Sequence, residues 1–280
     1  MPDKTKIADL LNFGIINIDK PSGPTSFTVS DYIRKQFALK KTSHFGTLDP
    51  KVTGVLPIAL GRACKLTGFF LGHDKEYVGI MHVHKEISLE DLQKTIDEFF
   101  IGTITQLPPK KSRVKRQERE REIKSFKLLE KNGKDFLFQA EVQGGTYIRK
   151  LIHDLGQKTE LGAHMLELRR IRAGIFSESS SVTLYEFNQA LQESHNGDSS
   201  RLRKMIVPAE EAIKKIMPVV QVKKEIIKGL KTGKPLFKKD ILGKIPDEDL
   251  FAVFCDDDFI EIAKQVDQGD IIAKPEFVFN

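Results

Sequence analysis

One acidic residue of this sequence lies in a loop from which its carboxylate could take part in a reaction. Asp49 lies in the segment from His44 to Gly54, immediately before Pro50 and close to Lys51. Pro50 restricts Asp49 to extended backbone angles, and the aspartate side chain therefore points away from the chain that follows. A carboxylate presented in this way can act as a nucleophile or a general base. An Asp-Pro pair also starts turns in many proteins, and the residues alone leave both interpretations open.

A second segment combines a double glycine with a basic residue at the start of a helix. Gly144 and Gly145 lead into an expected helix over residues 147–158, and Arg149 lies near the N-terminus of that helix. A cation at this end opposes the helix dipole, so a compensating carboxylate is expected nearby. Asp49 is a candidate for that partner.

Two other patterns bear on cofactors. Gly144-Gly145-Thr146 lacks the spacing of loops that bind nucleotide phosphates, so nucleotide-cofactor chemistry is not expected. His82 and His84 share one face of an expected strand and could seat a metal, but no third ligand lies at a useful spacing. We therefore expect no metal and no other cofactor, and we interpret the histidine pair as a strand surface.

The charge of the chain is unevenly distributed. Its 280 residues include 45 Lys and Arg against 39 Asp and Glu, and the net charge of +6 favours a polyanionic partner. Acidic residues predominate from residue 244 onward, so a polyanion should meet the earlier part of the chain. A basic stretch over residues 110–124 fits either a solvated hairpin or an RNA backbone site. The residues that would contact the RNA backbone are Lys110, Lys111, Arg113, Lys115 and Arg116.

The cysteine content and the apolar pattern limit the class of protein. The two cysteines, Cys64 and Cys255, exclude a disulfide scaffold and a cysteine-rich zinc module. No apolar run is long enough to cross a membrane. We expect a cytoplasmic protein without a membrane partner.

The hydrophobic pattern predicts strands and helices in alternation, followed by a β-rich end. A hairpin is expected across Asn132-Gly133, which is a strong type I′ turn signal, and residues 40–50 are expected to form a loop. Residues 218–280 are expected to form a small β-rich module docked on a larger domain of residues 1–217. The expected strands of the larger domain are residues 13–18, 55–60, 77–84, 123–129, 136–142 and 165–172, and its helices include residues 26–37, 62–71 and 147–158 with a further helix after Ser88.

Five motifs follow one another in a recognisable order. They are Asn17 to Ser26, His44 to Gly54, Lys75 to Tyr77, Gly145 to Gly156 and Gly162 to Arg170. Their order resembles the TruB branch of the pseudouridine synthases. It is most similar to the archaeal dyskerin-like enzymes, which are the catalytic subunits of H/ACA guide-RNA particles.

The resemblance extends over roughly residues 13–176 and implies a fold. That fold is an α/β (α+β) catalytic domain with a mixed, bent β-sheet flanked by helices. Residues 218–280 stand in the place of the family's small β-barrel PUA domain. By the same resemblance, residues 1–12 are expected to pack on the PUA-like domain.

The resemblance also assigns catalytic roles by position. Asp49 becomes the catalytic aspartate, Arg149 its ion-pair partner, and Tyr77 the aromatic residue that packs on the target base. A guanidinium beside a carboxylate lowers the pKa of the acid and fixes its orientation. Extruding the base from its stack costs a few kcal/mol, which stacking on an aromatic ring and contacts to phosphates offset.

Further residues are implied to bind the substrate. Leu168 would line the uracil pocket, and His44 would help to hold the everted nucleotide. Lys20 is grouped with them and belongs, with Pro21, to the motif that buttresses the catalytic loop. Ser43 and Phe45 differ from the glycine and small hydroxyl residue that usually flank the loop histidine.

The implied function is isomerisation of uridine to pseudouridine in ribosomal RNA, directed by an H/ACA guide RNA. The implied partners are the small proteins of that particle and a kink-turn-binding ribosomal-type protein. The alternative is a stand-alone enzyme acting on the T-loop uridine of transfer RNA. Bacterial stand-alone relatives carry a Gly-x-x-Tyr-x-x-Ala-Arg-x-Gly pattern after Pro-Pro, and its absence after Pro108-Pro109 favours the guided branch.

Two other classes of function compete with this interpretation. A catalytically silent RNA-binding scaffold would not need Asp49, Tyr77 and Arg149 together. A metal-dependent nuclease would use scattered acidic residues and would cleave RNA in a reaction that chelators stop. The sequence leaves open the target uridines, the guide RNAs, the stoichiometry of assembly, and whether the sugar or the base is attacked first.

Overall fold

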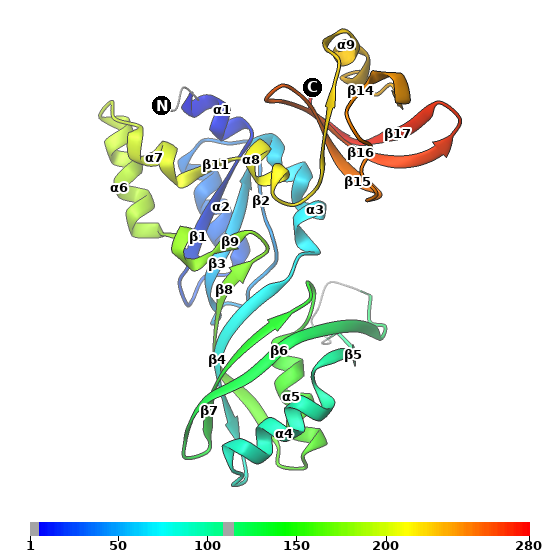
Figure 1. The fold of residues 1–280 in the computed structure, drawn as a ribbon. Helices are drawn as coiled ribbons and strands as arrows, with labels where there is room; N and C mark the ends of the chain where they lie inside the picture. Colours follow the sequence, from blue (N-terminus) through cyan, green and yellow to red (C-terminus); the bar gives the residue numbers. More distant parts are fainter. Residues whose placement is uncertain (1–5, 109–114) are drawn as a thin grey trace. The chain divides into compact units, whose positions relative to one another are not determined.

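A computed structural model describes residues 6–108 and 115–280 of the chain (Figure 1). The chain divides into a larger unit that ends at Ile206 and a C-terminal unit, Val207–Asn280. The sequence predicted this division after residue 217. The structure places it after Ile206, so helix α8 (Ala209–Lys214) belongs to the C-terminal unit. No helix among the described residues is long and apolar enough to span a membrane.

The larger unit is built on one mixed sheet, in which the strand order is β10-β1-β3-β8-β4-β7-β6-β5. β1 pairs antiparallel with β3, β3 pairs parallel with β8, and β8 pairs antiparallel with β4. The helices of this unit are α1 (Ile7–Asn12), α2 (Ser26–Gln36), η1 (Gly61–Leu66), α3 (Thr67–Leu71), α4 (Leu89–Phe99), α5 (Ile148–Lys158), η2 (Glu178–Ser180), α6 (Leu184–His195) and α7 (Ser200–Met205). Its strands are β1 (Gly14–Lys20), β2 (Thr42–His44), β3 (Thr53–Leu60), β4 (Lys75–Val83), β5 (Gly102–Gln106), β6 (Arg119–Asn132), β7 (Asp135–Val142), β8 (Ala163–Ala173), β9 (Phe176–Ser177) and β10 (Val182–Thr183), and β11 (Ile206–Pro208) lies at the division.

One end of this sheet forms what we call the β1–β3 half. Its core gathers Ile16 and Ile18 of β1 and Leu56 of β3 beneath helices α2 and α6, which contribute Ile33 and Phe187. Side chains spaced three or four residues apart on each helix supply the buried stripe. Leu10 of α1 belongs to the same core. Only 1% of Leu10 is exposed. The expected packing of residues 1–12 on the PUA-like domain stays a prediction.

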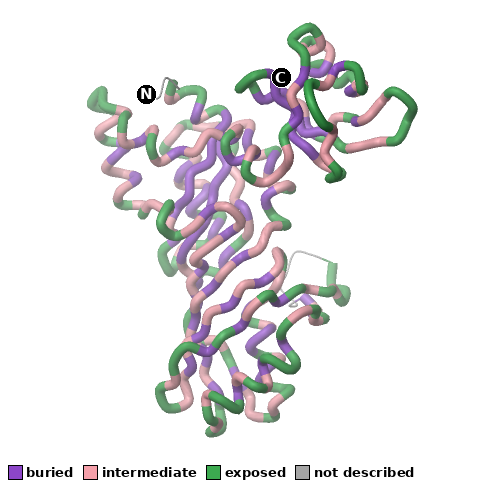
Figure 2. The backbone as a smooth tube through the Cα atoms, viewed as in Figure 1, coloured by how far each residue is buried: buried purple, intermediate pink, exposed green. Residues whose placement is uncertain are grey.

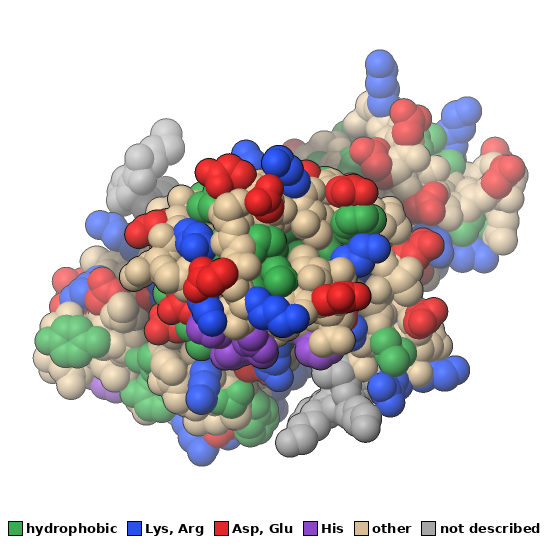
Figure 3. Space-filling view, turned by 90° about the horizontal axis from the view of Figure 1, so that it is seen from below, with side chains coloured by type: hydrophobic (Ala, Val, Ile, Leu, Met, Phe, Trp, Pro, Cys, Tyr) green, Lys and Arg blue, Asp and Glu red, His purple; other side chains and the backbone are tan. Residues whose placement is uncertain are grey.

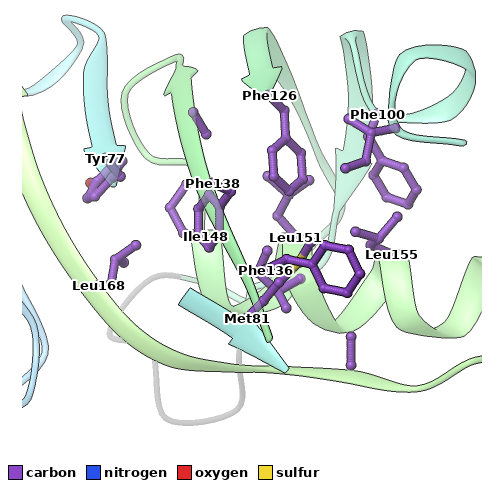
Figure 4. Packing of buried hydrophobic residues seen from close by; sticks show 14 of the residues in the cluster. Tyr77, Met81, Phe100, Phe126, Phe136, Phe138, Ile148, Leu151, Leu155 and Leu168 are labelled. Carbon is purple, nitrogen blue, oxygen red and sulfur yellow. The ribbon is translucent and has the colours of Figure 1, made fainter. Parts of the chain in front are cut away.

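The other end of the sheet forms the β4–β7 half, with a separate core. Alternate residues of β4 and β7 are buried, as the period of a strand requires, and they pack against α4 and α5 (Figure 2). Phe136 and Phe138 of β7 are fully buried among Leu151 and Leu155 of α5 (Figure 4). This half therefore fixes the direction of α5, which carries Arg149.

Two local predictions need correction. The hairpin between β6 and β7 turns at Gly133-Lys134, because Asn132 pairs directly with Asp135, and Gly133 takes the positive φ of 58° that such a turn requires. The expected loop over residues 40–50 contains a short strand, β2, which pairs with the far end of β3. That pairing places the loop that carries Asp49 between two strands of the same sheet.

The C-terminal unit is a nearly closed, barrel-like sheet with the strand order β13-β17-β16-β15-β12-β14. Its core contains Val253 of β15, Ile260 of β16 and Leu236 of β13. Glu261 of β16 is fully buried, and neither of its carboxylate oxygens has a hydrogen-bond partner. The elements are α8 (Ala209–Lys214), β12 (Val219–Val222), η3 (Lys224–Ile226), α9 (Ile227–Leu230), β13 (Leu236–Phe237), η4 (Lys238–Asp240), β14 (Ile241–Leu242), β15 (Leu250–Cys255), β16 (Asp258–Gln268) and β17 (Ile271–Val278).

Candidate active site

The loop that carries Asp49 is held on one side by the start of helix α2. The hydroxyl of Ser26 accepts a hydrogen bond from the Leu48 backbone N–H at 2.8 Å and donates to the Leu48 carbonyl at 3.0 Å. Ser26 is fully buried, and its position is fixed by Thr25, which caps the helix N-terminus. The residue before Asp49 therefore has both of its backbone polar groups satisfied by one side chain.

Lys20 holds the other side of the loop. Its Nζ donates to the carbonyls of Pro21, Pro50 and Val52 at 2.8–2.9 Å, and the side chain is completely buried. Burial lowers the pKa of Lys20, because it disfavours the charged ammonium. These contacts fasten the loop and leave no part of Lys20 exposed to a substrate, although the resemblance groups Lys20 with the substrate-binding residues.

The apolar residues of the loop join the core of the opposite half. Leu48 directly precedes Asp49 in the sequence, and Val52 follows a few residues later. Both are buried in the cluster that contains Tyr77, Ile148 and Leu168. The loop backbone is thus fastened by polar contacts to the β1–β3 half, while its apolar side chains pack in the β4–β7 half. Asp49 is held between them.

Arg149 is positioned by the first turn of helix α5. The side chain of Gln106 accepts a hydrogen bond from the Tyr147 N–H at 3.0 Å and donates to the Tyr147 carbonyl at 3.3 Å. Gly145 precedes the helix with a φ of 89°, a left-handed conformation that glycine adopts without strain. The burial of Ile148 then leaves Arg149 on the solvent side of the helix.

Asp49 and Arg149 form an ion pair through Oδ2 and Nη2. The aspartate side chain is 52% exposed and that of the arginine 59% exposed, so a ligand can reach the carboxylate. An ion pair this accessible to water contributes about 0–1 kcal/mol to stability. Its value is therefore to orient the carboxylate. The carboxylate that the helix pattern predicted near Arg149 is present.

Tyr77 and Leu168 lie together at one end of the core of the β4–β7 half (Figure 4). They come from the paired strands β4 and β8, and only 8% of Tyr77 and 9% of Leu168 is exposed. Both belong to the same cluster as Leu48, the neighbour of Asp49. The structure thus brings Tyr77 and Leu168 into the same core as the loop that carries Asp49, with most of the tyrosine side chain covered.

His44 is partly buried at the end of strand β2. Its Nε2 is 3.0 Å from the hydroxyl of Thr47, which ties the histidine to the loop that it precedes. Burial, and next the positive charge of Arg170, lower the pKa of His44. His44 is therefore neutral at physiological pH, and it can offer one donor and one acceptor nitrogen.

Two buried cations beneath the loop were missed from the sequence. Arg170 of β8 is 1% exposed and donates to the carbonyls of Gly46 and Val55. Lys75 of β4 is 5% exposed and donates to the Leu71 carbonyl at 2.6 Å. Burial, followed by the charge of Arg170, lowers the pKa of Lys75 to about 8. Nothing in the spacing of Arg169 and Arg170 indicates which of the two arginines faces inward.

The histidine pair set aside in the sequence gains a third member from β8. The rings of His82, His84 and His164 have centroids 5.1–5.9 Å apart, and histidine side chains gather on the face drawn in Figure 3. His84 Nε2 lies 2.9 Å from His164 Nδ1, and His82 Nδ1 lies 2.6 Å from Asp135. In the described part of the chain, however, no three potential ligands are arranged to hold a metal ion.

The predicted RNA-backbone residues are only partly described. Lys115 and Arg116 are exposed and lie just before strand β6. Lys110, Lys111 and Arg113 fall within residues 109–114, outside the described residues. The role of all five stays a prediction.

Comparison with known families identifies the family to which the chain belongs. Residues 34–148 match the model described as the N-terminal domain of the TruB family pseudouridylate synthases, and residues 149–214 match that of the tRNA pseudouridylate synthase B C-terminal domain. The chain belongs to the TruB family of pseudouridine synthases. Members of this family isomerise uridine in RNA to pseudouridine, and the resemblance inferred from the five motifs is confirmed.

Among sequence relatives of this TruB-family chain, one from Nanoarchaeum equitans is named "Probable tRNA pseudouridine synthase B". The two are 47% identical over 219 residues, which is 78% of this chain and 62% of the relative. The match thus spans less than two thirds of the length of that relative.

Two solved structures resemble this TruB-family chain over its whole length. The structure titled as a Cbf5-Nop10-Gar1 complex matches with a TM-score of 0.91 and 37% identity, covering 100% of this chain and 88% of that chain. A second, titled as an H/ACA RNP bound to a substrate RNA containing 2'-deoxyuridine, matches with a TM-score of 0.88 and 35% identity and covers 89% of its counterpart. The expected α/β catalytic fold with a PUA-like second fold is confirmed.

Proposed function

We propose that this protein isomerises uridine to pseudouridine in RNA, with Asp49 as its catalytic carboxylate. The observation that carries the proposal is the ion pair of Asp49 with Arg149, half exposed on a loop whose backbone is fastened on both sides. A carboxylate that is oriented, ionised and reachable is what the reaction requires. The family membership supports the same assignment.

The reaction is an internal rearrangement of one nucleotide. The N1–C1′ bond of uridine breaks, the base turns, and a bond forms between C5 and C1′. The proton on C5 is lost and N1 gains a proton, so atoms and electrons balance without an oxidant, a reductant or a cofactor. Asp49 must be ionised to assist this chemistry, and Arg149 holds its carboxylate toward the substrate.

The neighbouring residues receive roles in binding the extruded base. The exposed edge of Tyr77 would contact the uracil ring, and Leu168 would form the apolar floor beside it. His44, neutral and tied to Thr47, would hydrogen-bond the nucleotide. Lys115 and Arg116 would follow the RNA backbone, so replacing both with Gln should lower the salt dependence of RNA binding.

We further propose that the substrate is ribosomal RNA selected by an H/ACA guide RNA. The full-length similarity to chains in structures titled as an H/ACA RNP and a Cbf5-Nop10-Gar1 complex supports a particle with small protein subunits. A kink-turn-binding protein is the further expected partner, and the protein would work in the cytoplasm. A second candidate, the T-loop uridine of transfer RNA, is supported by the name of the Nanoarchaeum relative.

A single experiment tests the reaction and separates the two substrates. The purified full-length protein is incubated with unmodified transfer RNA alone, and separately with guide RNA, target ribosomal RNA and the small particle proteins. Pseudouridine is then mapped in each RNA. We expect conversion in the guided arm, and we expect Asp49→Asn to abolish it while leaving RNA binding intact.

Two other results would change the conclusion. Conversion of transfer RNA by the protein alone, without guided activity, would establish the second candidate in place of the first. An absence of pseudouridine in both arms would refute the proposed function and favour a silent RNA-binding scaffold. Full activity of Asp49→Asn would refute the assignment of Asp49 as the catalytic carboxylate.

A further inference from the structure

Arg170 is a guanidinium buried beneath the catalytic loop without a carboxylate. Its side chain is 1% exposed, and within the described residues it forms no ion pair. Its neighbours on β8, Arg169 and Arg172, each pair with two carboxylates. Burying an unpaired cation is costly unless its donors are fully used. The contacts of Arg170 should therefore explain why it is buried.

Those contacts join the two ends of the loop that carries Asp49. Nε of Arg170 donates to the carbonyl of Val55 at 2.8 Å, and Nη2 donates to the carbonyl of Gly46 at 3.0 Å. Gly46 lies on the entry side of Asp49 and Val55 on its exit side. The Arg170 side chain thus fixes the distance between the backbone at Gly46 and the backbone at Val55, and Asp49 lies on the loop between them.

The glycines at both ends of the loop fit closely around the same residue. Gly46 has a φ of 103°, and a Cβ there would lie 3.3 Å from Nη1 of Arg170. Gly54 has a φ of 100°, and a Cβ there would lie 2.2 Å from the Arg170 carbonyl oxygen. Strand pairing sets this contact, because Gly54 lies opposite Arg170 in the parallel register of β3 and β8. The approach of the loop to Arg170 thus requires glycine at both ends.

We propose that Arg170 is a positioning residue for pseudouridine formation, acting on Asp49 through the loop backbone. This inference rests on the proposed function, because it assumes that Asp49 performs the chemistry. Arg170 touches neither the carboxylate nor the substrate. It holds the carbonyls of Gly46 and Val55 so that the carboxylate stays in register with Arg149 and the C1′ of the nucleotide.

The geometry explains why lysine cannot replace this arginine. The planar guanidinium holds Nε and Nη2 at a fixed separation, whereas an ammonium presents all its donors from one point. Lysine would preserve the charge but could not span the carbonyls of Gly46 and Val55 with the same rigidity. A displacement of about 1 Å in a reacting group can cost roughly 100-fold in rate.

The test compares Arg170→Lys and Arg170→Gln with the wild-type full-length protein. Arg172→Lys serves as the matched control, since Arg172 lies on the same strand but pairs with Glu76 and Glu141. The substrate is unmodified RNA labelled with tritium at C5 of uridine, because bonding of C5 to C1′ releases that hydrogen. Single-turnover rates at saturating protein and the RNA dissociation constant are both measured, well below the melting temperature.

We expect both Arg170 variants to lower the single-turnover rate by roughly 10- to 100-fold, with RNA affinity changed less than about twofold. Arg172→Lys should retain the wild-type rate. A residue with a merely structural role would lower the melting temperature while the folded protein kept its rate. An Arg170→Lys protein that is folded and reacts at the wild-type rate would overturn the proposal.

A second variant decides the matter if the Arg170 variants do not fold. Gly46→Ala leaves Arg170 in place but introduces a Cβ beside its guanidinium, in a backbone conformation that favours glycine. We expect Gly46→Ala, like the Arg170 variants, to lower the single-turnover rate while RNA affinity is unchanged. A wild-type rate for Gly46→Ala would contradict the inference. Failure of the proposed function looks different, because then the wild-type protein itself would release no tritium.

Discussion

The two halves of the larger unit contribute to the site in different ways. In the β1–β3 half, buried polar side chains bind the backbone of the loop that carries Asp49, as Ser26 does at Leu48 and Lys20 at Pro50 and Val52. The β4–β7 half supplies an apolar core in which Leu48 and Val52 of the loop are buried, and a helix that presents Arg149. The backbone is thus fixed from one side, and the reactive side chain is oriented from the other.

Magnitudes explain this division of roles. An exposed ion pair such as Asp49–Arg149 is worth about 0–1 kcal/mol, too little to hold a loop in place. A buried hydrogen bond contributes about 0.5–1.5 kcal/mol, and leaving its partner unsatisfied costs about 1–3 kcal/mol. The buried contacts therefore build the loop, and the exposed pair only directs the carboxylate. Such a carboxylate stays accessible to RNA without weakening the fold.

The largest expected effect comes from comparing two Asp–Arg pairs that join distant parts of the sequence. Asp19 and Arg169 form a bidentate pair at 2.8–3.0 Å between β1 and β8, whereas Asp49 and Arg149 pair across the two halves. Asp49→Asn should lower the single-turnover rate at least about 1,000-fold, and Asp19→Asn less than about tenfold. Rates on tritiated RNA measure both, and the reverse order would remove Asp49 from the mechanism.

A smaller effect is expected from the cation that orients Asp49. Arg149→Lys keeps the charge but loses the planar fork, and the rate should fall roughly 10- to 100-fold. The melting temperature should be unchanged, because the pair is exposed. Arg169→Lys is the control and should leave the rate within a few-fold of wild type. Equal losses in the two variants would mean that the reaction does not distinguish the pairs.

The two cores can be compared by removing one aromatic ring from each. Phe138 in the β4–β7 half and Phe187 in the β1–β3 half are both fully buried. Phe138→Ala and Phe187→Ala should each destabilise the protein by about 3–5 kcal/mol, as measured by denaturant unfolding. Phe138→Ala should also lower the rate of the folded protein about tenfold, because Phe138 packs in the cluster of Tyr77 and Leu168. An equal loss of rate in Phe187→Ala would show that the two cores do not affect the reaction differently.

The smallest effect on the reaction rate is expected in the C-terminal unit, where a change should alter stability and leave the comparison of the two halves unaffected. Burial raises the pKa of Glu261 to about 8 from its usual value near 4.5. The folded state therefore binds this proton more tightly, and stability falls as the pH rises from about 4.5 through about 8. Glu261→Gln should flatten this pH dependence of stability. Thermal unfolding measured from about pH 5 to about pH 9, a range that includes the raised pKa, checks it. The exposed Asp267→Asn on the same strand should not flatten it, and a wild-type slope in Glu261→Gln would exclude Glu261 as its source.

Local chemistry made several features predictable from the sequence. The helix containing Arg149 follows from an apolar stripe and a preceding double glycine, and the β7 strand follows from strict alternation. Less predictable was the extent of burial at Tyr77, since an alternating strand does not tell which of its faces a substrate reaches. The turn after Asn132 was also shifted by one residue, since Asn132 pairs with Asp135 and leaves Gly133 and Lys134 as the central turn residues.

By itself, the sequence determined which groups could react and how the chain near each must run. Pro50 restricts Asp49 because the two residues are neighbours in the chain, and the order of the five motifs identifies the family because that order is a property of the chain itself. Only the tertiary structure decided that Arg149 meets Asp49, and that Arg170 rather than Arg169 lies beneath the loop. Those outcomes depend on strand register, where a shift of one residue exchanges the buried and exposed faces. Two irregularities in the pairing of β4 with β8 set that register, and no local pattern records them.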